Sequence, residues 1–127
     1  MSLRTPLGKV LGRGSAGEGV GHWWVQRVTS VALLPLTAWF LISLLGHSLQ
    51  SYEEMRGWLA QPWVAVLTIL LVLTLAWHSK LGIQVVIEDY VHSNGAKTLL
   101  LLTSTFLHAA AAVAGTFAIL VLALSPG

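Results

Sequence analysis

Residues 98–127 have the sequence TLLLLTSTFLHAAAAVAGTFAILVLALSPG, a run of 30 residues without a charged side chain. Two further uncharged runs precede it, one of 25 residues at 28–52 and one of 23 residues at 57–79. An α-helix needs about 20 apolar residues to cross a hydrocarbon core of roughly 30 Å, and each run supplies them. The sequence therefore predicts three transmembrane helices, at about residues 22–45, 62–87 and 98–124.

The overall composition also excludes a soluble protein. Apolar residues make up 55% of the 127 residues and charged residues only 9%, with a mean hydropathy of +0.75. Soluble domains contain roughly 25% charged residues, so the charges of this chain are too few to cover a globular surface. Helices are required because lipid offers no water to the backbone, and three segments cannot close a barrel. We therefore predict an all-α membrane protein.

Several kinds of site are excluded by composition as well. The chain has no cysteine, which excludes disulfides, thiolate metal sites, iron–sulfur clusters and covalently attached c-type haem. The net charge of +2 comes from a handful of residues, too few to form a nucleic-acid-binding surface.

Basic residues are distributed unequally about the predicted helices. The cytoplasmic side of a membrane protein carries the excess of Lys and Arg near the helix ends. The first connection contains only Arg56. The N-terminus and the second connection contain more, namely Arg4, Lys9, Arg13 and Lys97, with Lys80 within snorkelling reach. We therefore expect the N-terminus and the connection at 88–97 on the cytoplasmic side.

Tryptophans and glycines mark the ends of the predicted spans. Trp23 and Trp24 indicate one membrane interface, and Trp58 and Trp63 the other. Six of the 12 glycines lie within residues 1–21, so we expect a flexible polar arm there, followed by an anchor domain at 22–127. A signal peptide would have an apolar segment at this place, so the polar stretch indicates that residues 1–21 are not a cleaved signal peptide. No transit peptide is evident, which favours the bacterial cytoplasmic (inner) membrane over the mitochondrial inner membrane.

His78 is an ionisable residue inside a predicted span, where polar groups are costly and often functional. It lies about 12 residues, or roughly 18 Å, from the cytoplasmic end of its helix, near the middle of the membrane. Helical geometry places Gly82, Val85 and Asp89 on the same stripe as His78. A neutral imidazole is the usual axial ligand of haem iron, and a glycine one turn away leaves room for a flat cofactor. A histidine that only hydrogen-bonds a neighbouring helix is the alternative.

Three further polar residues lie inside the spans. Arg27 either reaches the lipid headgroups or pairs with a buried anion such as a haem propionate. Lys80 points about 200° away from His78, so we expect it to snorkel or to meet a partner subunit. His108 lies at a depth similar to that of His78 and could be a second haem ligand. We favour a structural role, because it begins a row of residues typical of helix packing: His108, Ala111, Ala112 and Gly115.

Asp89 and Tyr90 end the second predicted helix at the cytoplasmic interface. They could simply be a solvated acid and an interfacial tyrosine. A phenol and a carboxylate near the headgroups could also hydrogen-bond a lipid-soluble quinone and manage its protons. The three remaining histidines lie in or near connections, and we treat them as ordinary interfacial residues: His22, His47 and His92.

The stretch HSKLGIQVVIEDYV at 78–91 resembles a motif of the hydrophobic membrane-anchor subunit of succinate dehydrogenase, the small cytochrome b-type chain of respiratory complex II. In that family a histidine is followed by glycine four residues later and by Asp-Tyr at eleven and twelve. The matching residues here are His78, Gly82, Asp89 and Tyr90. The stretch HWWVQRVTS at 22–30 is similar to the family's first-helix arginine followed by small residues. The resemblance covers nearly the whole chain.

The resemblance implies a role for each site residue. His78 would be one axial ligand of a b-type haem, and the sister anchor subunit would supply the other. Arg27 would lie near a haem propionate, and Tyr90, supported by Asp89, would bind ubiquinone. A flavoprotein and an iron–sulfur subunit docked on the cytoplasmic face would deliver electrons from succinate. The chain would be a non-catalytic anchor and quinone-site subunit in aerobic respiration and the tricarboxylic acid cycle.

Other functions stay open on the sequence. A self-contained cytochrome could hold haem between His78 and His108. A fumarate reductase anchor subunit would share the same architecture. In a small transporter or purely structural subunit, His78 and Arg27 would only bind helices together. Three helices without an inverted repeat argue against a transporter.

Overall fold

The computed structural model describes residues 16–46 and 51–125, and within them the chain forms four helices and no strand. These are α2 (Ala16–Gly46), α3 (Tyr52–Leu59), α4 (Pro62–Tyr90) and α5 (Asn94–Leu124). Three stretches are long and apolar enough to cross a membrane, namely Val20–Gly46, Pro62–Tyr90 and Asn94–Leu124. The prediction of an all-α protein with three membrane-spanning helices is confirmed.

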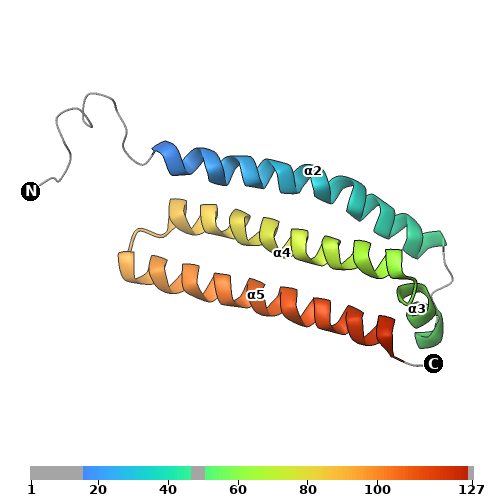
Figure 1. The fold of residues 1–127 in the computed structure, drawn as a ribbon. Helices are drawn as coiled ribbons and strands as arrows, with labels where there is room; N and C mark the ends of the chain where they lie inside the picture. The colour runs from blue at the N-terminus through green and yellow to red at the C-terminus, as the bar shows by residue number, and fades with distance from the viewer. Residues whose placement is uncertain (1–15, 47–50, 126–127) are drawn as a thin grey trace, which may run out of the picture.

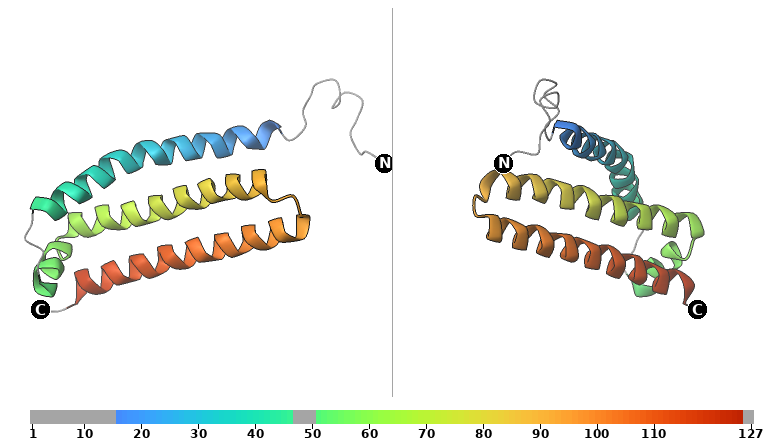
Figure 2. Two further views of the ribbon diagram at one scale, coloured as in Figure 1. Left: turned by 180° about the vertical axis from the view of Figure 1, so that it is seen from behind. Right: turned by 60° about the vertical axis from the view of Figure 1, so that its left-hand side comes forward.

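Helix α4 lies in the middle of the fold, with α2 along one side of it and α5 along the other (Figure 1). The start of α2 and the connection between α4 and α5 lie at one end, which we name the connection end. Helix α3 and the end of α5 lie at the other, which we name the α3 end. Figure 2 shows the same order of helices from behind and from the side. This up-down-up order agrees with the predicted topology, while the assignment of the connection end to the cytoplasm stays a prediction.

The long helices extend beyond their predicted bounds. Helix α2 begins at Ala16, so residues 16–21, which we assigned to the arm, are part of this helix. Residues 1–15 of that arm, and His47 in the first connection, lie outside the described residues. Three glycines made 16–21 look irregular, because each costs about 1 kcal/mol relative to alanine in a helix. Extension of the existing helix avoids the further cost of a new nucleus. Helix α4 likewise continues to Tyr90.

The first connection contains a short helix that we did not predict. The amide N–H of Glu54 donates to Ser51 Oγ, and the amide N–H of Ser51 donates to Glu54 Oε2, each at 3.2 Å. This reciprocal pair is a capping box, and it fixes the start of α3. The Ser-x-x-Glu spacing at 51–54 was the available signal.

The main hydrophobic core lies at the α3 end. Its buried residues come from α3, α4 and α5: Trp58, Leu59, Val64, Ala65 and Ile119. The ring of Trp58 stacks on Trp39 of α2 with centroids 6.2 Å apart. We predicted Trp58 at the membrane interface, but it is only 4% exposed, because α3 turns it into the core. Trp63, by contrast, is 54% exposed, as expected of an interfacial residue.

Helices α4 and α5 approach each other closely at Gly115. A Cβ atom on Gly115 would lie 2.9 Å from Cγ1 of Val72, closer than side-chain carbons normally approach. The glycine therefore allows the two helices to pack at this point, as the row of small residues on α5 predicted.

Candidate functional site

His78 projects from α4 toward α2. Its ring is half-buried, and Nδ1 lies 2.9 Å from the hydroxyl oxygen of Thr29. Thr29 Oγ1 also lies 2.9 Å from the carbonyl oxygen of Val25 and 3.0 Å from that of Gln26. Within the described residues Nε2 of His78 has no hydrogen-bond partner. One nitrogen of the ring is thus held by α2 and the other is available to a ligand.

The stripe of α4 that we expected to face a cofactor contacts α2 in one part and is exposed in the other. Gly82 faces α2, since a Cβ there would lie 3.8 Å from Nε2 of Gln26, an ordinary contact distance. Val85 and Asp89, further along the stripe, are exposed. The space beside Gly82 is therefore used by α2 of the same chain, whereas the connection end of the stripe is open.

Arg27 is exposed on α2, with its guanidinium carbon 5.6 Å from the ring centroid of Trp23. It borders a surface cavity of about 270 Å³ that is also lined by Trp24, Val28 and Val31. Arg27 and Thr29 are two residues apart, so they project about 200° apart on the helix. The structure consequently places Arg27 on a different face of α2 from the one that contacts His78.

His108 bonds α5 to α4. Its Nδ1 lies 2.7 Å from the carbonyl oxygen of Ser104, and its Nε2 lies 3.1 Å from Oγ of Ser79. Both ring nitrogens are therefore engaged in helix contacts. Ser79 projects about 100° away from His78 on α4, so the two histidines contact different helices. This geometry favours the structural role predicted for His108 and gives no support to a haem held between these two residues.

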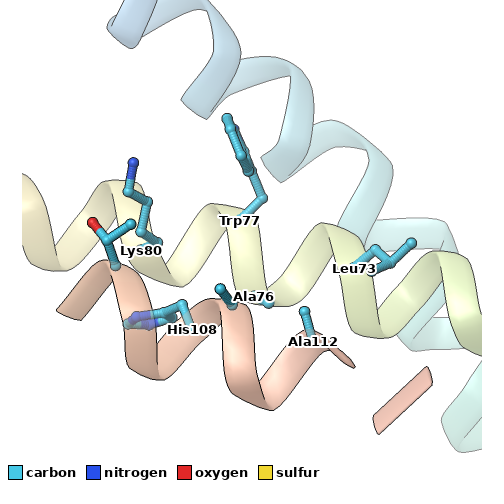
Figure 3. Close-up of a pocket in the computed structure, with 8 residues that line it drawn as sticks. Leu73, Ala76, Trp77, Lys80, His108 and Ala112 are labelled. Atoms are coloured by element: carbon cyan, nitrogen blue, oxygen red, sulfur yellow. The ribbon is translucent and has the colours of Figure 1, made fainter. Parts of the chain in front are cut away.

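A groove that we did not predict lies between α4 and α5. It encloses about 230 Å³, and Figure 3 shows Trp77 and Lys80 projecting from α4 and His108 and Ala112 from α5. A second cavity of about 200 Å³ continues from Lys80 toward Gln84 and Ser104. The Nζ atom of Lys80 lies 5.4 Å from the Trp77 ring centroid, a cation–π distance. None of His78, Arg27, Asp89 and Tyr90 lines this groove.

Asp89 and Tyr90 lie in the last turn of α4, at the connection end. Both are exposed, and Tyr90 is 78% exposed. The neighbouring Glu88 already has hydrogen-bond partners. Its carboxylate accepts a hydrogen bond from Gln84 Nε2 at 2.8 Å, and its carbonyl oxygen accepts one from Lys97 Nζ at 3.0 Å. Within residues 16–46 and 51–125 the side chains of Asp89 and Tyr90 have no such partner. They are the polar groups left free at this end of α4.

Sequence reasoning missed Thr29. The residue is quoted in the first-helix motif, but nothing in its spacing from His78 indicates that the two meet, 49 positions apart. The available signal was a pair of adjacent hydroxyl side chains, Thr29 and Ser30, near the start of the first uncharged run.

Comparison with known proteins decides the family. A family profile described as succinate dehydrogenase/fumarate reductase transmembrane subunit matches residues 1–123. The chain belongs to this family. It is 32% identical over 106 residues to the succinate dehydrogenase hydrophobic membrane anchor subunit of Paracoccus denitrificans, which covers 84% of this chain and 82% of the relative. It is 31% identical over 100 residues to the subunit of the same name from Rickettsia bellii (strain RML369-C), with 79% and 80% covered.

The succinate dehydrogenase membrane anchor subunit of Reclinomonas americana is 31% identical over 84 residues, covering 64% of this chain and 68% of the relative. The resemblance inferred from 78–91 is thereby confirmed: the chain is a succinate dehydrogenase membrane anchor subunit. It is a multi-pass membrane protein, and as an anchor it associates with other subunits of the complex.

The residues present fit a b-type haem. His78 offers a half-buried imidazole whose Nε2 is free among the described residues, as an axial ligand must be. Arg27 offers an exposed cation on the neighbouring helix. Of the two mid-span histidines among the described residues, His78 keeps one ring nitrogen free of helix contacts, whereas both nitrogens of His108 are engaged.

Proposed function

We propose that this anchor subunit shares a b-type haem with a second cytochrome b anchor chain and forms part of the ubiquinone-reduction site of succinate dehydrogenase. Its membrane is the bacterial cytoplasmic (inner) membrane, and the flavoprotein and iron–sulfur subunits dock on the cytoplasmic face at the connection end. One observation carries the proposal: a single helix, α4, contains the half-buried His78 inside the span and the exposed Asp89 and Tyr90 at its end.

His78 is the proposed axial ligand, through Nε2. A bound haem supplies a one-electron carrier inside the membrane. The protein contributes a neutral nitrogen donor at about 18 Å along the helix from Tyr90, so no charged side chain has to be buried for ligation. The contact of Nδ1 with Thr29 and the partial burial of His78 limit the rotation of its ring.

Arg27 is the proposed partner of a haem propionate. A guanidinium can bind a carboxylate through two parallel hydrogen bonds, which gives orientation as well as charge balance. The exposure of Arg27 leaves its donors available for such a partner. No contact in the described residues links it to His78, so this role rests on charge, exposure and the family resemblance.

Tyr90 and Asp89 are the proposed quinone-binding residues. Reduction of a quinone to a quinol adds two electrons and two protons, the same numbers that oxidation of succinate to fumarate releases. The Tyr90 hydroxyl can donate a hydrogen bond to a quinone carbonyl oxygen, which stabilises the negative charge that reduction places there. The exposed Asp89 carboxylate can take protons from water and pass them toward that oxygen. The electrons come from the partner subunits, since this chain lacks cysteine for clusters.

The experiment is an optical spectrum of the complex isolated through this chain, before and after addition of succinate. We expect a b-type haem band that succinate reduces in the wild-type complex and that His78→Ala removes. His108→Ala is the matched control: it replaces the other mid-span histidine and should leave the band in place. A wild-type complex without haem, or a haem lost with His108→Ala and kept with His78→Ala, would overturn the haem assignment.

A further inference from the structure

We propose that Thr29 is a positioning residue for His78: its hydroxyl oxygen accepts a hydrogen bond from Nδ1–H and thereby leaves Nε2 as the ligating nitrogen. The inference rests on the proposed role of His78 in haem binding. It is carried by the 2.9 Å contact between Thr29 Oγ1 and His78 Nδ1, which joins α2 to α4.

The direction of this hydrogen bond follows from a count of protons. A threonine hydroxyl has one proton to donate and can accept two hydrogen bonds. Around Thr29 Oγ1 lie two carbonyl oxygens, of Val25 at 2.9 Å and of Gln26 at 3.0 Å, and these can only accept. Threonines in apolar helices donate to the carbonyl one turn back. The hydroxyl proton is therefore directed to the backbone, and an oxygen lone pair is directed to the imidazole.

The imidazole must then supply the proton of the shared bond. A neutral histidine carries one N–H, so a proton on Nδ1 leaves the lone pair on Nε2. A metal-bound histidine is held in the same way in other proteins, with its second nitrogen donating to a fixed acceptor that sets both the tautomer and the ring orientation. In the opposite tautomer Nε2 would carry the proton and could not bind iron. Thr29 thus selects the form of His78 that can be a ligand.

The bond also affects the electron affinity of the proposed haem. An acceptor on Nδ1–H increases the electron density on Nε2 and makes it a better donor. A better donor stabilises the oxidised iron more than the reduced iron. Removal of the Thr29 oxygen should therefore raise the reduction potential of any haem that still binds.

The chain offers a matched set of variants on one turn of α2. Thr29→Val keeps the shape and removes the oxygen, whereas Thr29→Ser keeps the oxygen. Ser30→Ala is the control, because the Ser30 hydroxyl donates to the same carbonyl of Gln26 at 2.8 Å but does not bond His78. Each variant is isolated as the complete complex. The readouts are haem per flavin, the reduction potential of the haem, and the low-spin signal of the oxidised haem in electron paramagnetic resonance.

We expect Thr29→Val to weaken haem retention by about 10- to 100-fold and to shift the potential of residual haem upward. Thr29→Ser and Ser30→Ala should match the wild type in all three readouts. A Thr29→Val complex with wild-type haem content and potential would overturn the inference. If that variant does not assemble, Thr29→Ala removes the same oxygen while leaving more room, and the same criteria apply.

The outcomes separate this inference from the function on which it rests. If the wild-type complex has no haem, or if His78→Ala retains it, the haem assignment fails and the role of Thr29 fails with it. If His78→Ala loses haem while Thr29→Val is unchanged, only the positioning role is wrong.

Discussion

The α3 end and the connection end differ in how far their side chains are buried. At the α3 end, aromatic rings from α2, α3 and α4 contact one another, and Val64 is completely buried beneath them. At the connection end Asp89 and Tyr90 are exposed, and Arg27 is exposed further along α2, two residues from the Thr29 that contacts His78. The packing that holds the chain together is therefore concentrated away from the residues that we assign to quinone and propionate binding.

This separation suits a subunit that works inside a larger complex. Side chains buried within one chain cannot contact a partner, whereas exposed ones can. In the most apolar part of each span, 28% of the residues are buried in α4 but only 6% in α2 and 6% in α5. The outer helices leave most of their surface to lipid or to other subunits, and the connection end leaves its polar groups to ligands. Mutations at the two ends should accordingly have different consequences.

The largest expected effect on stability is that of Trp58→Ala at the α3 end. Truncation of a buried tryptophan costs about 3–5 kcal/mol, because apolar contacts are lost and a cavity is left. Thermal unfolding of the purified complex measures this loss. Trp24→Ala is the control, since Trp24 is 61% exposed near the connection end. Equal destabilisation by the two substitutions would contradict the difference between the ends.

A smaller effect is expected from Gly115→Ala, in the half of α5 toward the α3 end. The added methyl group would meet Cγ1 of Val72 at 2.9 Å, and overpacking of this kind costs about 1–3 kcal/mol. Val72→Ala in the same chain should recover part of the loss. Gly95→Ala, at the connection end of the same helix, meets nothing within 4 Å. It should stabilise the chain by about 0.4–1 kcal/mol, because alanine reduces the conformational entropy of the unfolded chain. Thermal unfolding that shows the same sign for both glycines would refute this comparison.

The smallest effect on stability is expected from Tyr90→Phe, which should leave thermal unfolding unchanged because the side chain is 78% exposed. Its effect should fall on function instead. Loss of one hydrogen bond to the quinone carbonyl should lower succinate:quinone activity by up to about 10-fold, while succinate oxidation with an artificial acceptor is spared. Tyr52→Phe is the matched control at the α3 end, where Tyr52 is 63% exposed. If Tyr90→Phe lowers both activities together, Tyr90 is structural.

The three spans were predictable because lipid imposes a simple requirement on them. An uncharged run of sufficient length is visible in the sequence whatever the chain packs against. The same holds for the position of Asp89 and Tyr90, since the end of a span follows from its length. Family membership was visible from the spacing of His78, Gly82, Asp89 and Tyr90, because all four lie on one helix and a spacing within one helix can be read directly from the sequence.

Contacts between helices were less predictable. They depend on how each helix is rotated and crossed, which a single helix does not reveal. The stripe through His78 was correct as a helical face, but the sequence did not show that α2 covers its first half at Gly82. The contacts of His78 with Thr29 and of His108 with Ser79 could not be predicted for the same reason. The burial of Trp58 was missed because the capping box at Ser51 was not used to predict α3.

The central place of α4 has a consequence for biosynthesis. Ribosomes deliver the chain from its N-terminus, so α2 enters the membrane first, α4 next and α5 last. The contact between Thr29 and His78 joins the first two long helices. It can form while α5 is still being synthesised. The proposed iron ligand would then have its orientation before the anchor is complete, and haem insertion need not wait for the final helix.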